Sequence, residues 1–164
     1  MRYAAVLVGA VSLLCALTPF AKAEQPRQTA FFGIKLINTS LEPVDDSETN
    51  RIAAVEQQLV SLLRESGRYV FVDTNELPDQ ARLYDNLAHC NGCDSQFARE
   101  LGADFALSGE IQKTSNLILH ISIYLRDADT GALVDGGSAD IRGNTDKSWE
   151  RGIRYIVKNR ILRD

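Results

Sequence analysis

The strongest constraint on the fold is the alternating stretch from Leu117 to Leu125. Aliphatic side chains occupy every second position, and the positions between them include His120, Ser122 and Tyr124. A period of two residues predicts a β-strand with one buried face and one partly solvated face.

A hairpin turn should follow this strand. The sequence DADTG at residues 127–131 is typical of a tight turn, with Gly131 where a positive φ is needed. Residues 132–141 should then return as the antiparallel partner. The pair Gly136-Gly137 predicts a bulge in that second strand.

Strands and helices alternate along the rest of the chain. Phe32, Ile34 and Leu36 are predicted to share one face of the first strand. The predicted elements are a strand at 30–37, a helix from Ser47 to the stop at Ser66-Gly67, a strand at 69–72, an irregular helix at 75–87, a helix at 94–101, a strand at 104–112, the two hairpin strands, and a final helix from Thr145.

The order of these elements, β-α-β-α-β-β-β-α, predicts the fold class. Crossovers between parallel strands are right-handed, and we expect the helices to lie together on one face. The predicted fold is a two-layer α/β sandwich with a mixed five-stranded sheet. Its first three strands are parallel, and an antiparallel pair completes it.

The N-terminal segment has the features of a secretory signal. Arg2 precedes an apolar stretch from Tyr3 to Leu17, which is shorter than the roughly 20 residues of a membrane span. A lipid-modified Cys15 is disfavoured, because Leu14 stands where a small residue is required. We therefore predict a cleaved signal peptide at 1–23 and a single periplasmic domain at 24–164.

Charge excludes some partners for that domain. Cleavage removes Arg2 and Lys22, which leaves 16 basic and 22 acidic residues and a net charge of −6. A nucleic acid or an anionic membrane would call for clustered Lys and Arg. No later apolar stretch is long enough to cross a bilayer. We expect neither a nucleic-acid partner nor a membrane span after cleavage, and we expect an envelope or periplasmic protein as partner.

Two cysteines, Cys90 and Cys93, remain after cleavage and form a C-N-G-C motif. In an oxidising compartment an even count favours a structural disulfide. A redox-active pair and a metal site that also uses His89 and Asp94 are alternatives. Covalent haem is excluded, because Asp94 stands where a histidine would be needed.

Polar residues are predicted to converge at one edge of the sheet. If Arg126 faces Ala132 across the hairpin, Asn116 faces Arg142, and a bulge would shift this pairing by a residue. The carboxyl ends of the first two strands should bring 38–40 and 73–75 to the same edge, where ligands of open α/β sheets bind. The candidate binding residues are Gln112, Lys113, Ser115, Asn116, Arg142, Asn144, Asp146 and Trp149.

Each of these residues also has a structural interpretation. Asn, Asp, Ser, Thr and Gly build turns and helix caps, so the two polar segments are also compatible with a tight turn and an N-cap. A protein-contact surface is a further alternative. Trp149 lies on the apolar stripe of the last helix, which favours core packing over ligand stacking.

The sequence contains no motif for catalysis. A phosphate-binding glycine loop, a HExxH motif and a GxSxG motif are all missing. His120 lies in the middle of a strand, where a half-exposed sheet residue is the favoured interpretation. We predict no enzyme, no catalytic residue, no metal and no cofactor.

Three motifs resemble a known family. They are the C-x-G-C motif at 90–93, Q-K-x-S-N-L-I-L at 112–119, and R-G-N-T-D-x-S-W-x-R-G at 142–152. Together they resemble an uncharacterised family of proteobacterial periplasmic proteins, a domain of unknown function, along nearly the whole mature chain. That family brings no established activity.

A broader likeness concerns the order of segments such as SGRYVFVD, ARELGADFALSGEI and RDADTGALV. It is similar to the amino-terminal domain of TolB and to periplasmic domains of curli-secretion lipoproteins. The likeness implies a non-catalytic binding or assembly accessory module. The alternative is a thiol-redox or metal accessory protein acting through the C-N-G-C pair, which the first resemblance links to a periplasmic quinoprotein oxidation system. The ligand and the oligomeric state stay open.

Overall fold

The computed structural model describes residues 25–75, 77 and 79–163. The predicted signal peptide, residues 1–23, lies outside this part of the chain. Within the described ranges, no helix combines the length and the hydropathy needed to cross a membrane.

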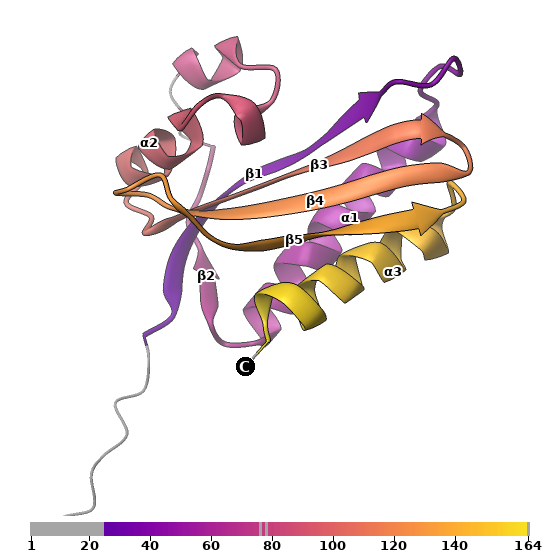
Figure 1. Ribbon diagram of the computed structural model, residues 1–164. Helices are drawn as coiled ribbons and strands as arrows, with labels where there is room; N and C mark the ends of the chain where they lie inside the picture. Colours follow the sequence, from indigo (N-terminus) through magenta and orange to yellow (C-terminus); the bar gives the residue numbers. More distant parts are fainter. Residues whose placement is uncertain (1–24, 76, 78, 164) are drawn as a thin grey trace, which may run out of the picture.

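A mixed five-stranded sheet forms the centre of the fold (Figure 1). The strand order is β2-β1-β3-β4-β5. Strands β2, β1 and β3 are parallel to one another, and β4 is antiparallel to both of its neighbours, β3 and β5. This confirms the predicted class, sheet and element order. The bounds are β1 Arg27–Asn38, β2 Tyr69–Phe71, β3 Phe105–Ser115, β4 Ile118–Asp127 and β5 Leu133–Arg142.

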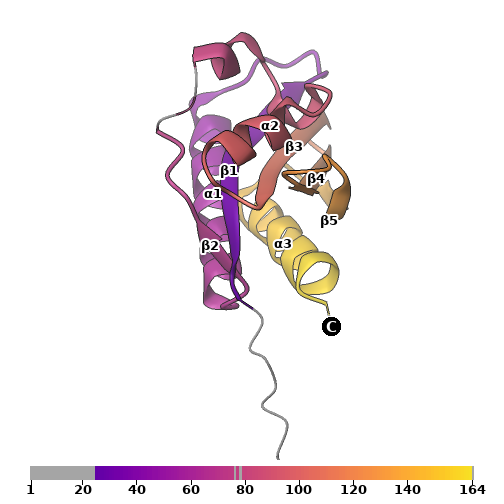
Figure 2. The ribbon, with the colours of Figure 1, turned by 90° about the vertical axis from the view of Figure 1, so that its left-hand side faces the viewer.

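Two helices cover one face of the sheet and one helix lies on the other. Helices α1 (Asp46–Glu65) and α3 (Asp146–Ile156), the latter extended by the π-helical turn η3 (Val157–Ile161), pack side by side. Helix α2 (Cys93–Glu100) packs on the opposite face, against Ala30 and Ala106. Both views show α2 apart from α1 and α3 (Figure 1, Figure 2).

The prediction that all helices share one face is therefore wrong for α2. The chain moves from β1 to β2 in one direction, and then crosses back over β1 to reach β3. Two right-handed crossovers that run in opposite directions place their helices on opposite faces of a sheet. The strand order, which the sequence did not reveal, decides the outcome.

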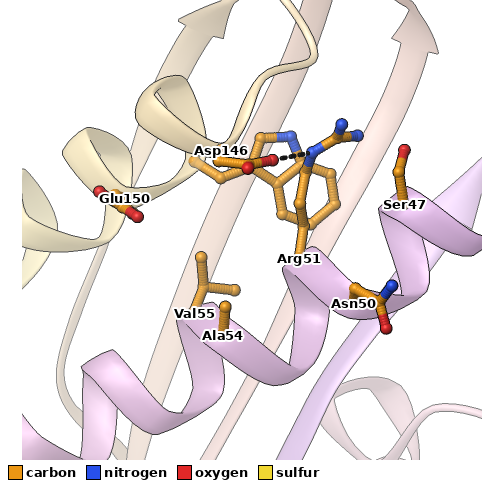
Figure 3. Close-up of a pocket in the computed structure, with 8 residues that line it drawn as sticks. Ser47, Asn50, Arg51, Ala54, Val55, Asp146 and Glu150 are labelled. Atoms are coloured by element: carbon orange, nitrogen blue, oxygen red, sulfur yellow. Dashed lines mark hydrogen bonds and ion pairs between the residues drawn. The ribbon is translucent and has the colours of Figure 1, made fainter.

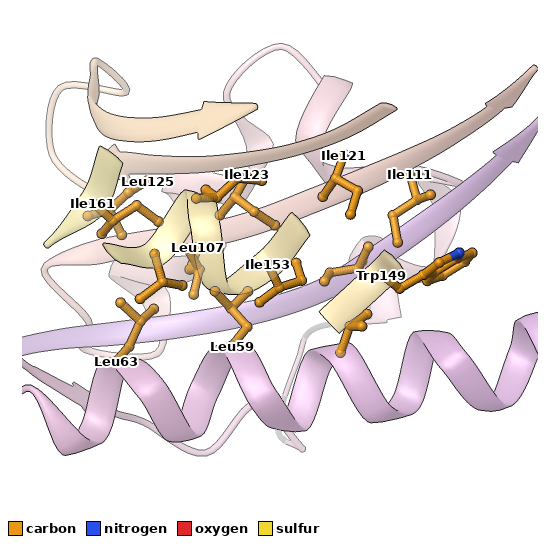
Figure 4. Close-up of a cluster of buried hydrophobic side chains, with 14 of the residues drawn as sticks. Leu59, Leu63, Leu107, Ile111, Ile121, Ile123, Leu125, Trp149, Ile153 and Ile161 are labelled. Carbon is orange, nitrogen blue, oxygen red and sulfur yellow. The ribbon is translucent and has the colours of Figure 1, made fainter. Parts of the chain in front are cut away.

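The main core lies between the sheet and the pair α1 and α3 (Figure 4). Helix α1 contributes Val55, Leu59 and Leu63, at the helical spacing expected for one buried stripe. The alternation in β4 is confirmed, except at Leu117, which lies in the preceding turn and is 72% exposed. The buried β4 side chains are Leu119, Ile121, Ile123 and Leu125.

A bulge in β1 inverts the predicted pattern of its aromatic residues. The register against β3 shifts between Phe31 and Ile34, and Gly33 has a φ of +84°. Phe31 therefore joins Ile34 and Leu36 on the main core, whereas Phe32 packs on the α2 side. The prediction that Phe32 shares a face with Ile34 and Leu36 is wrong, because one extra residue flips the alternation.

The second irregularity lies in β5. Leu125 faces Asp135 and Arg126 faces Leu133, so the extra residue is Val134 and not the predicted glycine pair. Gly136 is still required, because its φ is +144° and a Cβ would lie 2.4 Å from the carbonyl oxygen of Ile123.

The segment predicted as an irregular helix at 75–87 is also different. The described residues there form two short 3₁₀ turns, Asp79–Leu83 and Leu87–His89.

Gly136→Ala should lower the free energy of unfolding by about 3 kcal/mol, because it combines a backbone conformation reserved for glycine with a steric clash. Gly131→Ala is the matched control. Gly131 also has a positive φ, +71°, but its Cβ would have no neighbour nearer than 4.0 Å, so about 1 kcal/mol is expected. Urea unfolding followed by Trp149 fluorescence measures both, and equal losses would contradict the steric argument.

Candidate functional site

The two polar segments singled out in the sequence lie at the same end of the sheet. Arg142 faces Ile118, and the Asn144 N–H donates to the Asn116 carbonyl oxygen at 2.9 Å. The predicted pairing of Asn116 with Arg142 is wrong by two residues. The turn is one residue longer than assumed, and the bulge at Val134 adds one more.

Two loops, residues 38–40 and 73–75, were expected at this end of the sheet, and only the first of them lies there. The N–H and the hydroxyl group of Thr39 both donate to the Lys113 carbonyl oxygen, at 2.9 and 3.0 Å. Strand β2 pairs only with the first three residues of β1. Residues 73–75 therefore follow a strand that ends beside Thr29, at the other end of β1, and they do not join the site.

A buried ion pair holds this end of the sheet to α1. The Lys113 ammonium lies 2.7 Å from a carboxylate oxygen of Glu48, and their side chains are 2% and 0% exposed. Glu48 also accepts the N–H of Asp45 at 3.1 Å and the side-chain amide of Asn144. Burial raises the pKa of Glu48, but the donors from Lys113, Asp45 and Asn144 outweigh burial and leave that pKa below its usual value.

Asn144 connects this pair to α3. Its side-chain nitrogen donates to Glu48 and, at 3.1 Å, to the side chain of Asn116. Its side-chain oxygen accepts the indole N–H of Trp149 at 2.9 Å and a guanidinium N–H of Arg51 at 3.4 Å. Trp149 is fully buried in the main core with its polar atom satisfied.

The rest of the R-G-N-T-D-x-S-W motif starts α3. Thr145 is the N-cap, and its hydroxyl oxygen accepts the Ser148 N–H at 3.3 Å. The Ser148 hydroxyl donates to the Arg142 carbonyl oxygen at 3.1 Å. In the other segment, the Ser115 hydroxyl oxygen accepts two N–H groups of the β3–β4 turn. The candidate residues that remain exposed are Gln112, Asn116, Arg142 and Asp146.

A cleft of about 350 Å³ opens between α1 and α3 beside this network. The buried side chains of Val55 and Trp149 form its floor, and Arg51 pairs with Asp146 across the cleft at 2.6 Å (Figure 3). We call these surroundings the α1–α3 cleft. Its lining residues are Ser47, Asn50, Arg51, Ala54, Val55, Asp146, Trp149 and Glu150.

Sequence reasoning missed Glu48 and Arg51. The signal for Glu48 was its spacing from Asp45, since D-x-x-E before an apolar stripe is typical of a capping box, and the structure contains that box. No local signal identifies Arg51, because its partners Asn144 and Asp146 lie more than 90 residues away.

Cys90 and Cys93 form a disulfide at the start of α2, with Cα atoms 5.5 Å apart. The loop before the disulfide is held by Glu110 on the face of the sheet that lies opposite α1 and α3. This carboxylate lies 2.8 Å from a ring nitrogen of His89 and accepts a hydrogen bond from the Tyr124 hydroxyl at 3.2 Å. Within the described ranges, no group of three or more His, Cys, Asp or Glu side chains is arranged to hold a metal ion.

Asp94, which follows the disulfide, is buried with one carboxylate oxygen 3.3 Å from the guanidinium of Arg126. Burial raises the pKa of Asp94. The side chains of Asp94 and His89 are therefore both engaged with residues of the sheet.

The sequence matches one protein family over residues 27–161, named DUF3280 and described as "Protein of unknown function (DUF2380)". The chain belongs to the DUF3280 family. This confirms the predicted membership of an uncharacterised family. The curated proteins contain no match to this DUF3280 protein.

Solved structures share its fold. The LpoB C-terminal domain from Salmonella enterica has 14% identity and a TM-score of 0.53, over 74% of this chain and 87% of that chain. The PelC dodecamer from Paraburkholderia phytofirmans has 14% identity and a TM-score of 0.50, over 82% and 87%. At these identities the likeness shows the fold alone.

TolB from Acinetobacter baumannii also matches, with 13% identity and a TM-score of 0.43, over 77% of this chain and 26% of that chain. The match agrees with the distant likeness predicted from the sequence. The resemblance to curli-secretion lipoproteins stays a prediction.

Glu48→Gln should destabilise this DUF3280 protein by about 3 kcal/mol, because it leaves the Lys113 ammonium buried without a counterion. Lys113→Met should also be destabilising, because it leaves the Glu48 carboxylate buried without its cation. The double variant should lose about 1–3 kcal/mol less than the sum of the single losses, since the pair is removed together. Denaturant unfolding of the four proteins gives the cycle, and additive losses would contradict the coupling.

The pH dependence of stability should also report on Glu48. The folded state holds its pKa below the ordinary value of 4.5, so its contribution is complete above that value and is lost as the pH falls through the folded pKa. The stability difference between the native protein and Glu48→Gln should therefore narrow between about pH 6 and pH 3. A constant difference would mean that the charge of Glu48 is irrelevant.

Proposed function

We propose that this DUF3280 protein is a non-catalytic accessory module of the bacterial periplasm that binds a partner protein in the α1–α3 cleft. The observation that carries the proposal is the cleft itself, which combines the exposed side chain of Ala54, above a floor of Val55 and Trp149, with polar groups of Arg51 and Asp146. Concave sites of this composition are typical of binding.

The state of the surrounding polar groups supports binding over chemistry. Lys113 and Glu48 are paired and buried, and Asn144 uses both ends of its amide. These groups hold the sheet, α1 and α3 in fixed positions. A cleft with fixed walls binds without the cost of ordering its own elements.

Two further observations support the accessory role. The first 23 residues have the composition of an export signal, which favours the periplasm. PelC, which shares the fold, was solved as a dodecamer, and this supports the use of the fold for protein–protein contacts.

A thiol-redox role for Cys90 and Cys93 is the second candidate. The Asp94 N–H donates to the Cys90 sulfur at 3.2 Å, and such a donor also stabilises a thiolate. Equilibration of the periplasmic protein with glutathione redox buffers tests this role. A disulfide that stays oxidised at the lowest potentials would be structural.

Ala54→Arg should abolish the accessory function, because the new side chain fills the cleft from an exposed position that leaves the core intact. Ala53→Arg is the matched control, since Ala53 is also exposed on α1 and does not line the cleft. Each variant is tested for rescue of a strain that lacks the gene, with immunoblots of the periplasmic fraction.

The expected result is rescue by Ala53→Arg and failure of Ala54→Arg at equal protein levels. Rescue by both variants would remove the cleft from the proposed function. Recovery of the native protein in the cytoplasmic fraction would contradict the proposed location.

A further inference from the structure

A second surface of this molecule lies along the free edge of β5. The sheet ends at β5, and no strand of the described chain pairs with its outer edge. From Gly137 to Arg142 the strand keeps a regular register with β4. The backbone of such an edge is a template for an added strand.

At the opposite end of the strand order, the outer edge of β1 is covered. Strand β2 covers the start of β1, and beyond it the Ile34 N–H donates to the carboxylate of Glu56 at 2.7 Å. In β5, the described residues 137–141 have no backbone hydrogen bond other than those to β4. The strand also contains no Pro or Lys, the residues that commonly block edge pairing.

A groove of about 500 Å³ runs between this edge and α3. Its strand side is Ser138 to Arg142, and its helix side includes Arg151, Gly152 and Tyr155. Gly152 allows α3 to lie close to the sheet, since a Cβ there would be 2.7 Å from Ile121. Tyr155, at the wall of the groove, is 45% exposed.

The groove is basic in an acidic protein. Residues 142–163 carry seven of the 18 basic residues of the chain but only two of its 22 acidic residues. Arg142 and Arg151 line the groove, are exposed, and make no ion pair within the described part of the chain. Asp140 also lines it, but its carboxylate is engaged with His120 at 2.7 Å.

We propose that this β5 groove binds an extended acidic segment of a partner protein by strand addition to β5. Backbone hydrogen bonds to the free edge supply affinity. Alternate side chains of the added strand face α3, where carboxylates meet Arg151. A second copy of this chain fits poorly, because edge-to-edge pairing would bring two basic grooves together.

The β5 groove and the α1–α3 cleft lie on opposite sides of α3. Asp146 and Glu150 line the cleft, whereas Arg151 and Tyr155 line the groove. A variant of one surface therefore leaves the other intact, and the failure of one proposal does not imply the failure of the other.

The test uses the protein purified from the periplasm after expression of the full gene, and a blocked octapeptide of alternating glutamate and valine. Binding should shift the amide NMR resonances of 138–142 and slow their hydrogen exchange. A lysine–valine octapeptide should bind at least about tenfold more weakly. Shifts confined to other residues, or equal binding of the lysine peptide, would overturn the proposal.

Arg151→Glu should weaken binding of the glutamate peptide by about tenfold, since it replaces attraction with repulsion in the groove. Arg154→Glu is the matched control, because Arg154 is exposed on the same helix outside the groove. Equal loss in both variants would reduce the effect to non-specific charge. A concentration-dependent dimer of the native protein that Arg151→Glu strengthens would assign the edge to self-association and overturn the proposal.

Discussion

The arrangement of this fold depends on the buried ion pair between Glu48 and Lys113. Removing two charges from water costs more than their attraction returns unless further hydrogen bonds complete the arrangement. Here the completion comes from the Asp45 N–H and from Asn144. The network therefore forms only when α1, the end of β3 and the loop before α3 are all in place, and this requirement selects one arrangement of the three.

The same requirement explains why the most specific motif of the sequence surrounds Asn144. Asn144 contacts Glu48 and Trp149, and Thr145 is the N-cap of α3. The motif thus forms a joint, in the sense that it fixes how α3 is attached to the end of β5. The α1–α3 cleft is a consequence of that joint, because the joint fixes the distance between the two helices that form its walls.

Local patterns in the sequence predicted the elements and the buried face of β4, because alternation and helical spacing are local properties. They did not predict the face of α2, which depends on the direction of each crossover, or the face of Phe32, which depends on one bulge residue. Lys113 was assigned to a binding edge for a similar reason. Only Glu48, 65 residues away, shows that this lysine is a buried structural group.

Helix α3 separates the molecule into two surfaces of opposite character. Positions four apart lie on the same side of a helix, so Asp146 and Glu150 face α1, and Arg151 and Tyr155 face the edge of β5. On the acidic side Asp146 pairs with Arg51, whereas Arg142 and Arg151 in the groove make no ion pair within the described residues. The unpaired arginines therefore lie beside the free backbone edge of β5. A single extended acidic segment would pair with both the arginines and the edge.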